Sequence, residues 1–181
     1  MPIKNFWSLN VDEAIFADEL NARIRKHGRD ELQVFFPINN QLKSIDLIIF
    51  NTKTRGTRTF QVKGSRSWSD ENGSEYSWHQ VKQNDIDPKK CDFFVFVTYN
   101  TKTEKRKLSI KPSFMIIKTD ELLRIVKRDK KLGSGKTYHF NFNLAGKWFA
   151  DYRDLRPHVN KDNGINFSRY FDNFTRLIRS I

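Results

Sequence analysis

Three polar residues stand at positions that suit the hydrolysis of a phosphodiester. Asp46 lies at the start of one apolar run, and Gln61 and Lys63 flank Val62 in the next. In a strand the side chains alternate between faces, so Gln61 and Lys63 point the same way and Val62 offers its carbonyl at the edge. Carboxylate, amide and carbonyl oxygens are the ligands that hold magnesium. A bound cation neutralises the charge that develops on phosphorus and activates a water, which the ammonium of Lys63 can orient.

Two neighbouring strands are needed to bring these groups together. The runs 45–50 and 59–63 are rich in β-forming residues, and the polar, basic segment 51–58 with its glycine separates them. This pattern predicts an antiparallel hairpin. Its pairing brings all three polar residues to one edge of the sheet.

A helix is predicted ahead of these strands. Asn10 can cap it, an acid follows at the third position, and Gly28 ends it. Its apolar residues recur every four positions: Phe16, Leu20 and Ile24. Glu13 stands three positions before Phe16 and so lies near the buried edge of the helix, where it is a fourth candidate for the site. The alternative is a first-turn acid that only interacts with the helix dipole.

The rest of the chain predicts further strands and helices. Strands are expected at 33–37, 92–98, 114–117 and, as an edge strand or extended arm, 137–142. Helices are expected at 78–85, from Thr119 onward, and at 167–181. The polar segment 39–43 reads as a turn, the Gly- and Ser-rich segment 64–74 as a mobile loop, and 148–164 fits no element. We expect one α/β domain over 1–181, with a core at about 11–126 and a C-terminal extension at 137–181.

The charge balance indicates a polyanionic partner. Lys and Arg number 33 against 21 Asp and Glu, a net charge of +12, which favours encounter with nucleic acid. The alternative is that the charge only keeps the protein in solution. Cys91 is the single cysteine, so an intrachain disulfide and a thiolate zinc site are excluded. With no run as long as a signal peptide or a membrane helix, a soluble, cytoplasmic protein without membrane contact is expected.

In these positions the chain resembles the PD-(D/E)xK nuclease superfamily, over roughly residues 11–100. Asp46 stands at the motif aspartate, Gln61 at the acid-or-amide position and Lys63 at the lysine. Glu13 matches the acid that several branches, including archaeal Holliday-junction resolvases, carry on the first helix. Ile45 replaces the motif proline. The glutamine is similar to the D-QxK variant of Mrr-like restriction nucleases.

The resemblance implies an α/β, restriction-endonuclease-like fold, in which helices flank a mixed sheet with an antiparallel hairpin. It also implies a DNA endonuclease that uses Mg²⁺, or Mn²⁺, held by Asp46, Gln61 and the Val62 carbonyl, and that works as a homodimer to cut both strands. One alternative is a nuclease fold that binds DNA or assembles without cutting, because an amide removes one negative charge from the metal site. Another alternative function is an RNA-binding or RNA-processing module. For Gln61 and Lys63 alone, the alternative is an exposed strand face with no role in catalysis.

Five further residues are candidates for contact with DNA. Lys53, Arg55 and Arg58 lie in the predicted hairpin tip, from which they can reach phosphates. Arg66 and Trp68 follow the motif directly, where they can touch the backbone and stack on an unpaired base. The alternatives are a solvated hairpin tip and an aromatic side chain that covers the core.

Overall fold

The protein is described by a computed structural model, which covers residues 11–37, 44–64, 66–69, 75–104, 107–128, 137–143, 148–150 and 165–181; for parts of several strands it describes the backbone alone. The helices are α1 (Val11–Lys26), α2 (Thr119–Arg128) and α3 (Phe174–Arg179), with 3₁₀ turns at Gln83–Asp85 and Ser168–Tyr170. None of these helices is long and apolar enough to cross a membrane. The strands are β1 (Leu32–Phe35), β2 (Leu47–Asn51), β3 (Thr57–Lys63), β4 (Arg66–Ser69), β5 (Glu75–Lys82), β6 (Phe93–Glu104), β7 (Lys107–Lys118), β8 (Thr137–Asn143), β9 (Trp148–Ala150) and β10 (Ile165–Asn166).

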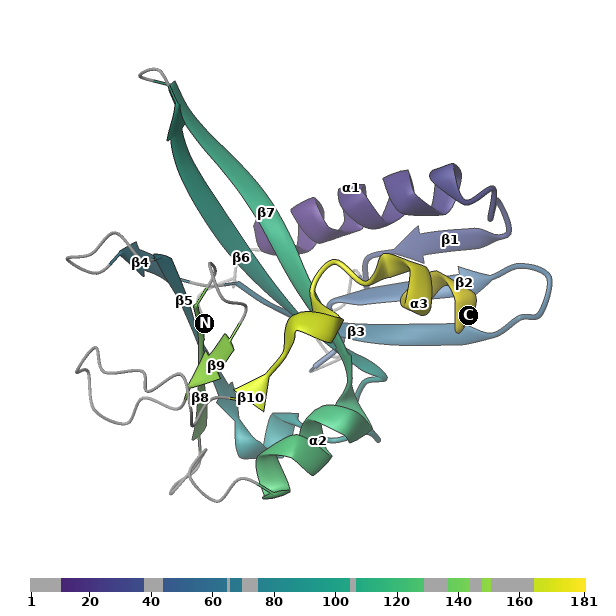
Figure 1. The fold of residues 1–181 in the computed structure, drawn as a ribbon. Coiled ribbons are helices and arrows are strands. Elements are labelled where there is room, and N and C mark those ends of the chain that lie inside the picture. Colours follow the sequence, from purple (N-terminus) through teal and green to yellow (C-terminus); the bar gives the residue numbers. More distant parts are fainter. Residues whose placement is uncertain are drawn as a thin grey trace, which may run out of the picture.

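The strands form two five-stranded sheets (Figure 1). The first has the order β1-β2-β3-β6-β7, in which only the β3–β6 pair is parallel. A parallel pair requires a crossover, and here the crossover contains β4 and β5. These two strands join a second sheet with the order β10-β9-β8-β5-β4. The expected α/β class and the mixed sheet with an antiparallel hairpin are confirmed.

One face of the first sheet is covered by α1 and α3. The Phe16 ring on α1 lies 5.8 Å from that of Phe60, 5.6 Å from that of Phe114 and 6.0 Å from that of Phe174 on α3. The helix has acids in its first turn and bases in its last, which suits its dipole. It ends where Gly28 takes a φ of 61°, a conformation that favours glycine. This packing fixes the start of α1, and with it Glu13, beside the sheet.

The opposite face of the first sheet packs against the second sheet and α2. Phe96 on β6 lies 5.0 Å from Phe140 and 5.7 Å from Phe142, ring centre to ring centre, and both of those residues belong to β8. Leu122 and Val126 of α2 complete this second core. Residues after 137 therefore supply strands and core side chains to the body of the protein.

The structure corrects two predictions in the crossover. The segment 64–74 was predicted to be a loop, but residues 66–69 form β4. The segment 78–85 was predicted to be a helix, but β5 continues to Lys82 before a 3₁₀ turn. Ser77, His79 and Val81 are buried and alternate with less buried neighbours, which is the period of a strand.

Three further predictions differ from the structure. The 137–142 strand lies between β5 and β9 and so is not an edge strand. The strands predicted at 92–98 and 114–117 continue as a hairpin of 12 residues on each side. The helix predicted at 167–181 is reduced to α3, because Asp172 has a φ of 49° and Asn173 caps the helix through a hydrogen bond from Arg176 N–H. The predicted turn 39–43 and most of 148–164 lie outside the described residues.

Candidate functional site

The start of β2 and the end of β3 place Asp46 against the Gln-Val-Lys segment. The Gln61 amide donates a hydrogen bond from Nε2 to Asp46 Oδ2 at 2.8 Å, and the Val62 N–H donates to the same oxygen at 2.6 Å. The Asp46 N–H donates to the Phe60 carbonyl at 2.7 Å. The antiparallel pairing thus brings the predicted acid and amide into direct contact.

Backbone geometry places a second oxygen at this edge. The N–H and C=O of a strand residue face the same neighbouring strand. Because the Val62 N–H points to Asp46, the Val62 carbonyl lies along the same edge. It is beyond Leu47, the first residue of β2, and so has no β2 residue opposite it. Gln61 is a buried residue, 6% exposed, and its Nε2 donates to Asp46, which leaves Oε1 as an acceptor.

Electrostatics tie Glu13 and Lys63 to the same place. Burial raises the pKa of Glu13 to about 7, and the negative charges of Asp46 and Asp12 add to this shift, while the charge of Lys63 opposes it. Burial also raises the pKa of Asp46, against the hydrogen bond from the Val62 backbone and the charge of Lys63. The two carboxyl groups and the ammonium are therefore close enough to perturb one another.

Asp12 links three elements around this site, and it was missed in the sequence. A Cβ on Gly64, the residue after Lys63, would lie 1.7 Å from Asp12 Oδ2, so only glycine lets Asp12 pack there. The Tyr99 hydroxyl of β6 donates a hydrogen bond to Asp12 Oδ1. Burial, together with that bond, raises the pKa of Tyr99, which keeps its hydroxyl protonated. The available signals were a glycine directly after Lys63 and a second acid directly before Glu13.

The oxygen donors at this edge fit a hard divalent cation. They are the Asp46 carboxylate, the Gln61 amide oxygen and the Val62 carbonyl, a set that suits Mg²⁺ or Mn²⁺ rather than a soft metal. Among the described side chains, no group of three or more His, Cys, Asp or Glu could hold a metal. A metal site here depends on the amide and carbonyl oxygens.

Two buried residues nearby carry no charge at neutral pH. Burial lowers the pKa of His79 on β5 to about 3, so its imidazole is neutral. Burial raises the pKa of the Cys91 thiol to about 11, although Lys63 acts in the other direction. Neither residue supplies a charged nucleophile or an anionic ligand.

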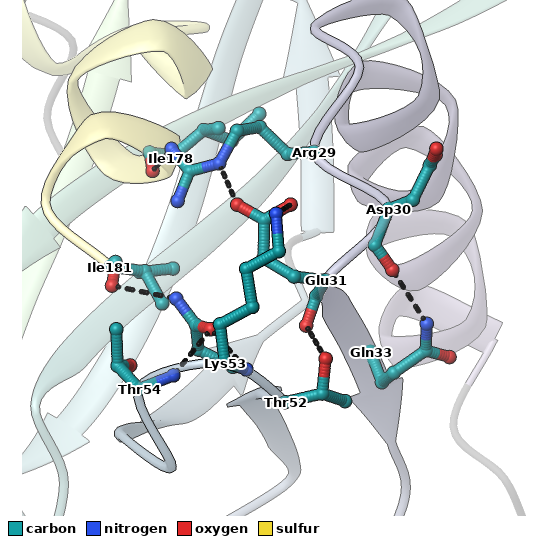
Figure 2. Close-up of polar contacts among 10 residues, drawn as sticks. Arg29, Asp30, Glu31, Gln33, Thr52, Lys53, Thr54, Ile178 and Ile181 are labelled. Carbon is teal, nitrogen blue, oxygen red and sulfur yellow. Dashed lines mark hydrogen bonds and ion pairs between the residues drawn. The ribbon is translucent and has the colours of Figure 1, made fainter.

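The hairpin-tip residues lie at the far end of β2 and β3. Lys53 and Arg55 follow the last residue of β2, about 17 Å along the strand from Asp46. Lys53 Nζ is 3.9 Å from Glu31 Oε2, and Figure 2 shows this pair close to Arg29 and the 178–181 segment. Arg58 Nη2 donates to the Ser180 carbonyl at 3.3 Å. The structure does not gather these three basic residues with Asp46.

Arg66 and Trp68 belong to β4, which pairs with β5 in the second sheet. Their side chains lie outside the part of the chain that the structure describes. Their proposed contacts with DNA stay predictions.

The site thus joins one carboxylate, one amide and one backbone carbonyl on two strands with Glu13 on α1 and Lys63 at the end of β3. The Asp12 contacts hold α1 against β3 and β6. Comparisons of the chain with protein-family models, with curated protein sequences and with solved structures found no match.

Proposed function

We propose that this protein is a metal-dependent DNA endonuclease with a restriction-endonuclease-like core. The observation that carries the proposal is the contact of Asp46 with Gln61 and the Val62 N–H, beside Glu13 and Lys63. The element order supports it, since a helix leads into an antiparallel β1-β2-β3 meander, and β6 then extends the sheet in parallel.

In this proposal Asp46, the Gln61 amide oxygen and the Val62 carbonyl would hold a divalent cation. When bound, Mg²⁺ or Mn²⁺ supplies charge neutralisation at the phosphate and lowers the pKa of a water. The raised pKa of Glu13 supports a cation here. Burial and the nearby charge of Asp46 both disfavour a negative charge on Glu13, and a bound cation would offset this cost.

The remaining roles fall to Lys63 and Glu13. The ammonium of Lys63 orients the attacking water and stabilises the additional negative charge on the phosphoryl oxygens. With its pKa of about 7, the Glu13 carboxylate can take up the proton that this water loses. The water oxygen forms a bond to phosphorus, one ester P–O bond breaks, and the leaving oxygen takes up a proton from the surrounding water.

A second candidate function is DNA binding without cleavage. The observation that favours it is that Gln61 donates its amide N–H to Asp46, so this carboxylate has hydrogen-bond donors without a cation. An amide also contributes less negative charge to a metal site than a carboxylate does.

If the protein does cut both strands of a duplex, we propose that it acts as a homodimer, with one site for each strand.

The deciding experiment is incubation with supercoiled, branched and linear DNA in Mg²⁺ or Mn²⁺. The wild type is compared with Asp46→Ala and Lys63→Ala, and with the control variants Asp18→Asn and Lys26→Ala at exposed positions of α1. We expect cleavage by the wild type and both controls. The Asp46 and Lys63 variants should lose it while they still unfold in one cooperative transition above the temperature of the assay.

The other outcomes are equally informative. DNA that is bound with the same salt dependence by all variants but is never cut would favour the binding protein. Cleavage that survives both Asp46→Ala and Lys63→Ala would overturn the assignment of the site.

A further inference from the structure

The β6–β7 hairpin continues past the strand that carries the candidate site. β3 pairs with β6 only from Phe60–Phe93 to Lys63–Phe96. The β6–β7 pairing continues to Glu104–Lys107, about 27 Å beyond Phe96 at the rise of a strand. Figure 1 shows this two-stranded ribbon projecting from the body of the molecule. Because β6 runs parallel to β3, the ribbon leaves the sheet at the same end as Lys63.

The strand register separates the residues of the ribbon into two faces. One face carries the pairs Asn100–Lys111, Lys102–Ser109 and Glu104–Lys107. The other face carries the pairs Tyr99–Pro112, Thr101–Ile110 and Thr103–Leu108. All the charged residues of the ribbon strands beyond Val97 and Phe114 therefore stand on one face, three basic and one acidic.

This charged face continues the sheet face on which Gln61 and Lys63 stand, opposite the face that α1 covers. Lys63 is in register with Phe96, so both residues stand on one face of the sheet. Successive residues of a strand belong to opposite faces, so positions 98, 100, 102 and 104 of β6 share that face by register. Lys102 lies six positions beyond Phe96, roughly 20 Å from it along the strand. In the sequence, Lys105 and Arg106 between the two strands add two more positive charges.

We propose that the β6–β7 ribbon binds duplex DNA through the face that carries Lys102, Lys107 and Lys111, and holds the duplex across the Asp46–Lys63 edge. This inference rests on the proposed function, because it takes DNA as the partner. The side chain of Lys111 is exposed, as phosphate contact requires. The positive charge of this face is complementary to a phosphate backbone.

The dimensions of the ribbon suit a duplex. A two-stranded β-ribbon fits the major groove, which is about 12 Å wide. The separation of roughly 20 Å between the Lys63 end of β3 and Lys102 is more than half of the ~34 Å helical turn of DNA. Ribbon and candidate site can therefore contact the same duplex on one side.

The test compares two triple variants that remove the same charge. The ribbon variant is Lys102→Ala, Lys107→Ala and Lys111→Ala, and the control is Lys26→Ala, Lys89→Ala and Lys127→Ala, all exposed lysines elsewhere. Binding of a labelled duplex is measured by fluorescence anisotropy between about 50 and 200 mM salt. If each ribbon lysine contacts one phosphate, the log-log salt slope of the ribbon variant becomes less steep by about 2 to 3. The control should keep a slope closer to that of the wild type.

A second ribbon variant removes the projection itself. Residues 101–110 are replaced by Asn-Gly, a pair that closes a two-residue hairpin between Asn100 and Lys111. It should lose affinity at least as far as the triple variant does. Thermal unfolding checks that each variant is folded, and the rise in unfolding temperature with Mn²⁺ checks the Asp46 site.

The outcomes separate this inference from the proposed function. Weaker DNA binding by the ribbon variants supports the ribbon, even if the wild type never cuts DNA and the endonuclease is thereby overturned. Wild-type cleavage with unchanged affinity and slope in folded ribbon variants overturns the ribbon alone. A wild type that binds no duplex overturns both.

Discussion

At the scale of single residues, the pairing of Asp46 with an amide is the central feature of the candidate site. Gln61 donates to the carboxylate that the Val62 N–H also contacts. A second carboxylate at position 61 would instead place two like charges within hydrogen-bonding distance in a buried setting. The amide thus stabilises the metal-free protein, and it reduces the negative charge of the residues that would bind a metal.

Gln61→Glu should make the metal-free protein less stable and its metal binding stronger. Without metal, the loss of the hydrogen bond and the new like charge should lower stability by about 1 to 3 kcal/mol. Mn²⁺ should raise the unfolding temperature of the variant more than that of the wild type, because a carboxylate binds the cation more strongly than an amide does. Calorimetry in EDTA and in Mn²⁺ measures both effects, with Gln80→Glu at an exposed position of β5 as control. An identical Mn²⁺ response in variant and wild type would contradict the proposed metal ligand.

The raised pKa of Glu13 predicts a pH-dependent stability. Its pKa is about 7 in the folded protein and 4.5 as its ordinary value, so the folded state holds a proton that the unfolded state has released between these pH values. The contribution of Glu13 is fully present below pH 4.5 and is lost as the pH rises through 7. The groups that set it are Asp46, Lys63 and Asp12.

Glu13→Gln should therefore gain stability relative to the wild type between pH 5 and 8, on the order of 1 kcal/mol for a half-exposed side chain. The two proteins should be equally sensitive to pH below 4.5. Urea unfolding across this range without divalent ions provides the measurement. A constant difference at every pH would show that Glu13 does not titrate near neutrality.

At the scale of elements, the site depends on how α1 meets the sheet. Asp12 packs where Gly64 has no Cβ and accepts a hydrogen bond from Tyr99. These contacts join the first turn of α1 to the ends of β3 and β6, and Glu13 is the next residue. The position of Glu13 relative to Asp46 is therefore fixed by a contact between elements.

A double-mutant cycle tests this contact. Gly64→Ala should destabilise the protein by about 1 to 3 kcal/mol, because the new methyl group takes the place of the Asp12 carboxylate. In an Asp12→Ala background the same substitution should cost less than about 0.5 kcal/mol, since its clash has been removed. Chemical denaturation of the four proteins gives the coupling energy. Additive effects would mean that Asp12 does not pack on Gly64.

At the scale of the whole molecule, two sheets enclose two hydrophobic cores. The whole chain has a net charge of +12. The second sheet includes β8, and the first core includes α3, so the C-terminal part supports the sheet that carries the site. The charge attracts polyanions to the whole surface, and the ribbon places three basic residues on the face shared with Lys63.

DNA binding by the wild type should therefore depend strongly on salt. If about five phosphates are contacted, the log-log slope for duplex DNA should lie near −4 to −5. Titrations at several salt concentrations measure it, and sedimentation on DNA shows whether two copies bind one duplex. A slope near zero would rule out phosphate contacts as the source of affinity.

The elements next to the site follow from local patterns in the sequence. The four-residue period of Phe16, Leu20 and Ile24 predicted α1, and the β-rich runs predicted the β2–β3 hairpin, because these patterns are local. That hairpin is what brings Asp46 to Gln61. The net charge likewise follows from composition alone.

Other features depend on residues far apart in the sequence, and local patterns could not reveal them. A helix was predicted at 78–85, but β8, some 60 positions later, pairs with β5 from Tyr76–Asn143 to Lys82–Thr137 and holds residues 78–82 in a strand. The Asp12–Gly64 contact and the ribbon face both need residues that are remote in sequence to meet. The pKa of Glu13 depends on burial and on Asp46, which no spacing along one helix can reveal.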